Sequence, residues 1–149
     1  MIDLRDASVA AEAVIDALDL KPHPEGGHFR ETWRDVPTEG GRGVGTAILY
    51  LLAAGQRSHW HRVDAAELWL WQAGAPLSLR IGRDPAHRLG PPIDAGGALQ
   101  RVVPRHCWQS AESLGRWTLC SCVVTPAFEF AGFELAPPGW RPTARGKPA

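Results

Sequence analysis

After Pro22 the chain consists of short β-rich runs separated by clusters of Gly, Pro and Asp. No second helical period appears beyond this point, so the pattern indicates a mostly β protein. About eight runs are candidate strands, at residues 28–34, 46–52, 58–63, 67–72, 77–82, 99–104, 116–126 and 128–135. They suit a closed barrel or a two-sheet sandwich, because both arrangements hide the strand edges that otherwise promote aggregation.

The first twenty residues are the exception, because they follow a helical pattern. Apolar side chains recur at the spacing of one helical face, at Ala11, Val14, Ile15 and Leu18. Asp6 or Ser8 is available as the N-cap, and Pro22 stops the segment soon afterwards. We therefore expect a short amphipathic N-terminal helix.

The length of 149 residues matches one ordinary domain with its own hydrophobic core. Residues 20–136 hold the candidate strands and are predicted to form one barrel, on which a helix within residues 1–19 packs. Residues 137–149 contain four prolines, few apolar residues and no strand alternation. This composition is typical of an extended or disordered tail.

The charges of the chain exclude some classes of partner. Sixteen basic and sixteen acidic residues cancel, so no overall positive field attracts nucleic acid or anionic membranes, and neither is expected as a partner. Residues 1–20 include five acidic residues and no uninterrupted apolar run, so we expect no signal peptide, no spanning helix and a cytoplasmic protein. The three cysteines are expected to be reduced and buried.

Two histidines and one carboxylate form the strongest candidate site. His59 and His61 are two apart on a predicted strand, so both side chains project from one face. Glu67 opens the next predicted strand and lies opposite them if the two strands form a hairpin. Such a set holds divalent Fe, Mn, Ni, Co or Zn with open coordination positions, as metal catalysis requires. A purely structural interpretation stays open, in which the histidines are hydrogen-bonded in a polar interior and Glu67 pairs with an arginine.

The same residues resemble a known motif. Gly55, His59, His61, Glu67 and Gly74 are similar to the first motif of the cupin superfamily, which has Gly, then His-x-His, then Glu, then Gly. Residues 104–109 resemble its second motif, Pro-x-Gly-x-x-His, with His106 at the glycine and Gln109 at the histidine position. The resemblance implies a metal set of His59, His61, Glu67 and Gln109. Because the glutamine oxygen is a weaker donor than imidazole, a metal-free site also stays open.

A closer resemblance covers residues 20–135. The chain is similar to an uncharacterised cupin family, with an RmlC-like jelly roll, that has a His-Pro-Glu-Gly-Gly motif near its start, here His23 to Gly27. That resemblance implies a jelly-roll barrel forming a homodimer, with His61 and Glu67 as its steadier pocket residues. From the residues alone, the motif indicates a turn, because its glycines allow positive φ or a close backbone approach.

Three further side chains are candidates for binding a substrate together with Gln109. Trp69 and Trp71 alternate with Glu67 on one predicted strand and place two indoles on its face, either as pocket walls or as core filler. Glu31 lies on the apolar face of its strand, which is costly for a carboxylate unless it is paired or functional. Arg34 points to the opposite face in regular alternation, so any pairing partner of Glu31 is expected from a neighbouring strand.

These observations predict a small-molecule-binding protein. We expect an enzyme acting on a small polar metabolite such as a sugar, isomerase-like or epimerase-like, in which His61 and Glu67 act as acid and base or hold a metal. Two alternatives stay open, a ligand-binding or sensing module without turnover and a metal-dependent oxygenase. The sequence does not name the substrate.

Overall fold

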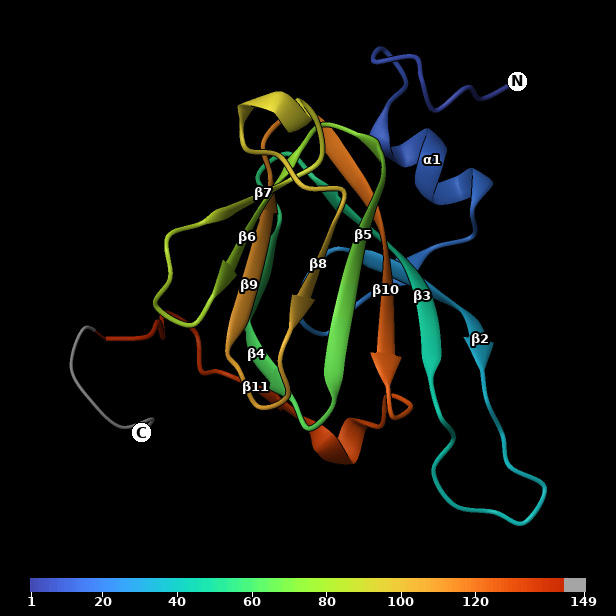
Figure 1. Ribbon diagram of the computed structural model, residues 1–149. Helices are drawn as coiled ribbons and strands as arrows, with labels where there is room; N and C mark the ends of the chain where they lie inside the picture. Colours follow the sequence, from blue (N-terminus) through green and yellow to red (C-terminus); the bar gives the residue numbers. More distant parts are fainter. Residues whose placement is uncertain (144–149) are drawn as a thin grey trace.

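The structure is a computed structural model that describes residues 1–143 and contains two antiparallel β-sheets and one short α-helix (Figure 1). One sheet has six strands in the order β1-β2-β3-β10-β5-β8, and the other has five in the order β11-β4-β9-β6-β7. The elements are α1 (Ala11–Ala17), β1 (Lys21–Pro22), β2 (His28–Arg34), β3 (Thr46–Ala53), β4 (Arg57–Val63), β5 (Ala66–Gly74), β6 (Leu77–Ile81), β7 (His87–Leu89), η1 (Ile93–Ala95), β8 (Gln100–Val103), β9 (Gln109–Ser113), β10 (Trp117–Thr125), η2 (Phe130–Gly132) and β11 (Phe133–Leu135).

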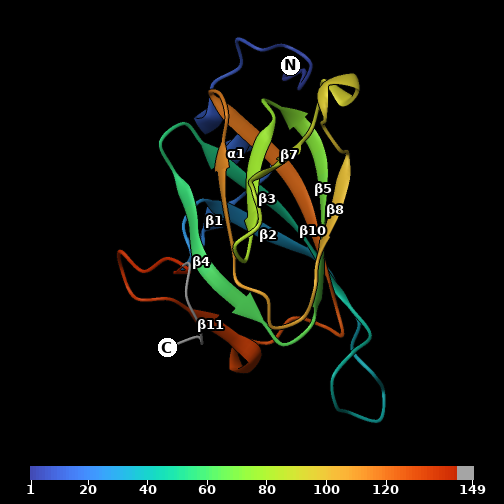
Figure 2. The same cartoon turned by 60° about the vertical axis from the view of Figure 1, so that its left-hand side comes forward.

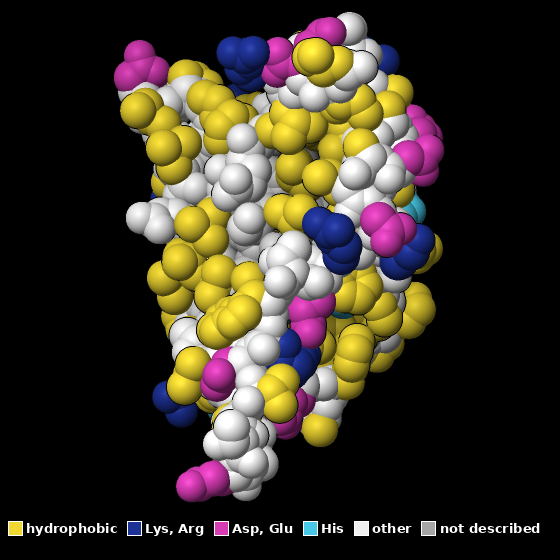
Figure 3. Space-filling model, turned by 90° about the vertical axis from the view of Figure 1, so that its right-hand side faces the viewer, with side chains coloured by type: hydrophobic (Ala, Val, Ile, Leu, Met, Phe, Trp, Pro, Cys, Tyr) yellow, Lys and Arg dark blue, Asp and Glu magenta, His cyan; other side chains and the backbone are white. Residues whose placement is uncertain are grey.

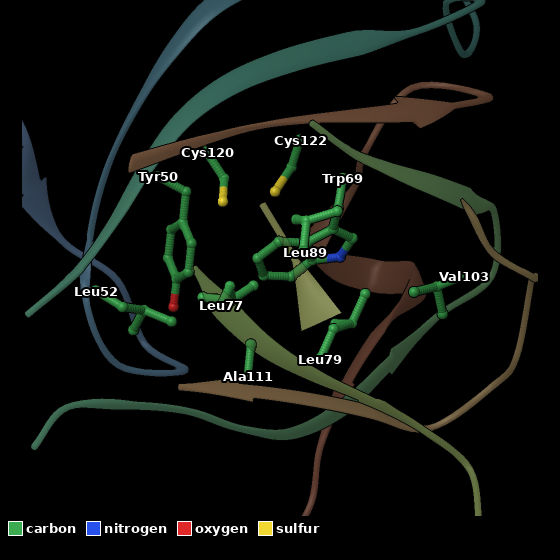
Figure 4. Close-up of a cluster of buried hydrophobic side chains, with 10 residues drawn as sticks. All are labelled: Tyr50, Leu52, Trp69, Leu77, Leu79, Leu89, Val103, Ala111, Cys120 and Cys122. Atoms are coloured by element: carbon green, nitrogen blue, oxygen red, sulfur yellow. The ribbon is translucent and has the colours of Figure 1, made fainter. Parts of the chain in front are cut away.

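The main hydrophobic core fills the space between the sheets. Figure 4 shows Tyr50 of β3 and Trp69 of β5 at its centre, with Leu79 of β6 facing them from the other sheet. Cys120 and Cys122 of β10 point into the same core, and both thiols are free. Burial raises the pKa of Cys120 to about 12, so this thiol stays protonated at neutral pH.

The helix α1 lies against the outer face of the six-stranded sheet (Figures 1 and 2). Val14 is completely buried there and packs in a second cluster with Leu51, Trp117 and Leu119. The expected helix is therefore present, but its N-cap is Ala10, without a side-chain cap, and not Asp6 or Ser8. Asp6 instead accepts a hydrogen bond from the backbone N–H of Ser8 at 2.8 Å.

The predicted all-β barrel with a short N-terminal helix is confirmed. Three short strands were not expected, namely β1, β7 and β9, and the run 128–135 begins with the 3-10 turn η2 and becomes a strand only at Phe133. The sequence of β9, Gln-Ser-Ala-Glu-Ser, has a low β-propensity, and its place between β4 and β6 overrides that preference. No helix of residues 1–143 is long and apolar enough to cross a membrane.

The hairpin of β2 and β3 extends beyond the body of the protein (Figures 1 and 2). Figure 3 views the molecule from this side, where hydrophobic side chains are interspersed with single charged ones. Exposed hydrophobic residues of the hairpin are Trp33, Val36 and Val44. The expected homodimer stays a prediction.

After β11, residues 137–143 run without regular secondary structure. Trp140 nevertheless packs against Trp108, with ring centroids 4.4 Å apart, and against the edge of Trp60. The rest of the predicted tail, residues 144–149, lies outside the described residues.

Candidate functional site

A cavity of about 70 Å³ lies at the end of the barrel next to η2, between the two sheets. Its hydrophobic wall contains four phenylalanines, Phe29, Phe128, Phe130 and Phe133. Its histidine, arginine and carboxylate side chains are His23, Glu25, Glu31, Arg34, His61 and Glu67. Apolar walls with a few convergent polar groups are the usual composition of a small-molecule site.

Glu25 enters the cavity from a tight turn between β1 and β2. The turn is closed by hydrogen bonds from His23 N–H to Gly27 O and from Gly26 N–H to His23 O, both 3.0 Å. Gly26 has φ of 108°, and a Cβ at this position would lie 2.1 Å from the carbonyl oxygen of Arg57. Glycine is therefore required by both the backbone conformation and the space available. The turn fixes Glu25 against β4, where its carbonyl accepts a hydrogen bond of 2.8 Å from His59 N–H.

Glu25 and His61 form a buried ion pair. Glu25 Oε2 lies 3.0 Å from His61 Nε2, and His61 Nδ1 donates to the carbonyl of His59 at 2.7 Å. Burial alone would lower the pKa of His61, but the charge and hydrogen bond of Glu25 outweigh it and raise the pKa to about 9. Burial opposes ionisation of Glu25 as well, and His61 in turn lowers the pKa of this carboxyl below its usual value. At neutral pH the pair is therefore an imidazolium and a carboxylate.

His23 lies beside this pair as a neutral ring. Its Nδ1 accepts a hydrogen bond of 3.1 Å from the backbone N–H of Glu25, so this nitrogen carries no proton. The separation of 3.9 Å between His23 Nδ1 and Glu25 Oε1 is for that reason not an ion pair. Burial, which outweighs the attraction of Glu25, lowers the pKa of His23.

Glu67 is the second buried carboxyl of the cavity. Its Oε1 accepts a hydrogen bond of 2.7 Å from Gln109 Nε2, and Gln109 Oε1 accepts one of 2.8 Å from the indole of Trp69. Burial raises the pKa of Glu67, the charge of His61 lowers it and that of Glu25 raises it again, with a net value of about 7. Near neutral pH the carboxyl of Glu67 is therefore protonated in some molecules and ionised in others.

The mouth of the cavity contains a further ion pair. Arg34 donates to both oxygens of Glu31, at 2.9 and 2.8 Å, and to the carbonyl of Phe128 at 2.9 Å. The expectation that Arg34 points away from Glu31 was wrong, because the register of β2 shifts between Glu31 and Trp33. This β-bulge interrupts the alternation and places both side chains at the cavity.

The four predicted metal ligands do not come together. The register of β4 shifts between Ser58 and His61, and His59 Nε2 bonds the carbonyl of Pro137 at 2.9 Å, outside the cavity. Both nitrogens of His61 are already bonded within the protein, and the amide of Gln109 joins Trp69 to Glu67. Within residues 1–143 no group of three or more His, Cys, Asp or Glu side chains is arranged to hold a metal. The donor set therefore does not fit a cupin metal centre in this arrangement.

The two remaining candidates, Trp69 and Trp71, do not line the cavity. Trp69 is 1% exposed and packs edge-on against Tyr50, so it fills the core while orienting Gln109. Trp71 lies farther along β5, where its indole donates to Ala75 O at 3.1 Å, and does not line the cavity.

Sequence reasoning missed Glu25 and His23 as site residues. The signal was the His-Pro-Glu-Gly-Gly segment, in which a carboxylate precedes two glycines of a tight turn.

Comparison with known proteins agrees with the fold. Residues 12–136 match the family model described as cupin superfamily (DUF985), whereas a search of curated proteins finds no match. A crystal structure of a protein from Shewanella oneidensis is 32% identical, with a TM-score of 0.81 over 86% of this chain and 85% of that one. A hypothetical protein from Leishmania major is 30% identical, with a TM-score of 0.76 over 85% and 86% of the two chains.

A more distant similarity is to the DMSP lyase DddQ from Ruegeria pomeroyi, which is 16% identical. The TM-score is 0.58, over 95% of this chain and 62% of that one. At this identity the similarity shows the fold alone. The family match spans most of the chain and agrees with the two-sheet barrel, so the protein belongs to the cupin superfamily, in the family DUF985.

Proposed function

We propose that this protein is a cupin-type enzyme that moves a proton on a small polar metabolite, such as a sugar, in an isomerase-like or epimerase-like reaction. One observation carries the proposal. Glu67, whose pKa is about 7, lines the same buried cavity as His61, which Glu25 keeps cationic. A base poised near neutral pH beside a fixed positive charge is the arrangement that proton abstraction next to a carbonyl requires.

The two side chains have different roles in this proposal. Glu67 removes a proton from the hydroxyl-bearing carbon next to a carbonyl, which leaves an enediolate, and returns it to the former carbonyl carbon on the same face, while the hydroxyl proton passes between the two oxygens of the enediolate. His61 does not transfer a proton, because Nε2 and Nδ1 are engaged with Glu25 and the carbonyl of His59. Its positive charge instead stabilises the negative charge that develops on the substrate oxygen. Glu25 is a positioning residue that maintains this charge.

The cavity limits the size of the ligand. A volume of about 70 Å³ admits only the reacting end of a metabolite, so the rest of the ligand must contact the mouth. There the exposed Phe130 and the pair of Glu31 and Arg34 offer an apolar surface and polar groups. The expected substrate is therefore a small polar molecule that also has an apolar part.

Proton transfer of this kind works without a metal, because Glu67 and His61 supply the base and the charge. The cupin family suggests a divalent metal, and of the four predicted ligands His61 and Glu67 line the barrel cavity.

Hydrogen exchange tests the proposal without knowledge of the product. Aldoses, ketoses and 2-oxo acids are incubated with the protein in D₂O, and loss of each C–H signal is followed by proton NMR. We expect exchange in one substrate class, reduced by about 100-fold or more in Glu67→Gln. Glu134→Gln, on the outside of β11, is the matched control and should exchange like the wild type. Exchange in none of these compounds, or equal exchange in Glu67→Gln, contradicts the proposal.

A binding or sensing module without turnover is the second candidate. It is favoured by the closure of the mouth, where Arg34 joins Glu31 to the backbone of Phe128 and would retain a bound ligand. Saturable binding of one of the compounds above, without any C–H exchange, would support this function in place of the first.

A further inference from the structure

A groove on the outer face of the five-stranded sheet is separate from the barrel cavity. Two adjoining hollows of about 470 and 400 Å³ share Trp60, Arg80 and Arg141. Figure 2 brings this sheet forward, with the C-terminal segment passing beside β4. Each hollow has the volume of an ordinary small-molecule site. We call the combined depression the arginine groove.

The floor of the arginine groove is built by three neighbouring strands. Arg80 of β6 pairs in register with Ser110 of β9, and Arg57 of β4 pairs with Glu112. The wall is the segment after β11, held by a hydrogen bond of 2.9 Å from Ala136 N–H to the carbonyl of Trp60. The groove is thus formed by a rigid sheet and a tethered segment.

The groove is positively charged, although the whole chain is neutral. Arg80 and Arg141 are exposed, and the side chain of neither forms a hydrogen bond or ion pair with another residue of 1–143. Arg57 faces Glu112 at 3.2 Å, an exposed pair that is readily exchanged for another anion. The other charged groups lining the groove are Asp84 and Arg83, which has a partner of its own. Cations therefore outnumber anions at this site.

A hydroxyl is the second observation. Ser110 lines the groove, and within the described part of the chain its hydroxyl has no hydrogen-bond partner and is not one of the fully buried unpartnered atoms, so it is accessible from the groove. A hydroxyl in register with an unpaired arginine is a donor for an oxygen anion, and the planar guanidinium donates two parallel hydrogen bonds to phosphate.

Indole rings form the apolar side of the groove. Trp140 lies edge-on to Trp60, with centroids 6.2 Å apart, and contacts Trp108 at a centroid distance of 4.4 Å with the ring planes tilted by 42°. Arg62 covers Trp108 at 4.8 Å, so the aromatic cluster is held from both sides. Trp140 itself is only partly buried, and the accessible part of an indole held in this way is a surface on which a planar ring packs.

We propose that the arginine groove binds a nucleotide, with its phosphate on Arg80, Arg141 and Ser110 and its base against Trp140. Trp140 and the arginines line one hollow, so one small ligand can reach both. His59, which was expected in the barrel cavity, lines this groove instead. The proposal does not depend on the chemistry of Glu67.

Calorimetric titration of the full chain at low salt tests the proposal with adenosine monophosphate, adenosine and inorganic phosphate. We expect saturable binding of the nucleotide that is about tenfold tighter than that of either part. Arg80→Gln and Arg141→Gln should each weaken it by about tenfold, and Ser110→Ala by about threefold. Arg88→Gln is the matched control, because Arg88 is exposed on β7 of the same sheet but outside the groove, and it should change the affinity by less than about twofold.

No saturable binding of the nucleotide, or an equal loss in Arg88→Gln and Arg80→Gln, overturns the proposal, provided that thermal unfolding shows each variant to be folded. A 5′-phosphorylated oligodeoxyadenylate distinguishes two sources of the same ligand. If the oligonucleotide binds more weakly than the mononucleotide, the ligand of the groove is a free nucleotide. If it binds more tightly, the ligand is the end of a nucleic acid strand. Either result supports recognition of phosphate and base in the groove.

Discussion

Glu25 Oε2 lies 3.0 Å from Nε2 of His61, and both side chains are buried in the barrel cavity. The turn of Gly26 and Gly27 brings the carboxylate to the histidine from a distant part of the sequence. This pair determines the charge state of the whole site. It maintains a positive charge beside Glu67, whose own carboxyl is then the group left to exchange protons.

Breaking the pair should cost much stability. We expect Glu25→Gln to lower the free energy of unfolding by about 3–5 kcal/mol, because the charge of His61 is left buried without its partner. Denaturant unfolding at pH 7 measures the change. Glu31→Gln, which breaks the half-exposed pair with Arg34, is the control and should cost less than about 1 kcal/mol. Similar losses in the two variants would show that the buried pair contributes no more to stability than the half-exposed pair.

The turn that carries Glu25 should tolerate no side chain at Gly26. In Gly26→Ala the new Cβ clashes with the backbone of Arg57, and the positive φ is strained as well, so we expect a loss of more than about 2 kcal/mol in unfolding free energy. Gly40→Ala is the matched control, since Gly40 has φ of 79° but open space around it, and about 1 kcal/mol is expected there. The prediction fails if both variants lose the same amount.

The hydrogen bond from Gln109 should tune Glu67. In Gln109→Leu the carboxyl of Glu67 and the indole N–H of Trp69 each lose a partner, which we expect to cost about 1–3 kcal/mol. Because the hydrogen bond from the Gln109 amide favours the ionised carboxylate, its loss should raise the pKa of Glu67 above its value of about 7. In the exchange assay the rise of activity with pH should then occur at higher pH than in the wild type. An unchanged pH profile would show that Gln109 does not act on Glu67.

The stability of the protein should depend on pH through the same two groups. The pKa of Glu67 is raised from 4.5 to about 7, so its contribution is complete below pH 4.5 and is lost as the pH rises through 7. The pKa of His61 is raised from 6.5 to about 9, so its contribution is complete below pH 6.5 and is lost as the pH rises through 9. Unfolding measured in steps from pH 5 to 9 should show both declines, and Glu67→Gln should lack the first. A first decline that persists in Glu67→Gln would assign it to another group.

Local sequence patterns were enough to predict the fold class. The alternation of β-rich runs and turn residues predicted the strands 28–34 and 46–52 closely, as they lie in β2 and β3. It missed β9, whose small polar residues form a strand only because β4 and β6 flank them. Strand pairing over long distances is not visible in local propensity.

The site was only partly predictable, because strand irregularities and long-range contacts decide it. Strict alternation predicted that His59 and His61 share one face and that Arg34 and Glu31 lie on opposite faces. A register shift in each strand changes both arrangements, so that His59 lies away from His61 and Arg34 lies beside Glu31. Glu67 and Gln109 are hydrogen-bonded, and their proximity was implied only by the resemblance to the two cupin motifs. Glu25 was not assigned, because it lies in the turn between β1 and β2 while its partner His61 lies on β4, and no local spacing connects them.

The most direct test of the account is a carbon-13 NMR titration of the carboxyl groups in protein labelled at glutamate, between pH 4 and 9. Glu67→Gln identifies the signal of Glu67 by its disappearance. The account predicts that this carboxyl titrates with a midpoint near pH 7, in a fully folded protein. A midpoint near 4.5, the ordinary value for glutamate, would contradict the assignment of Glu67 as the base and with it the proposed proton transfer.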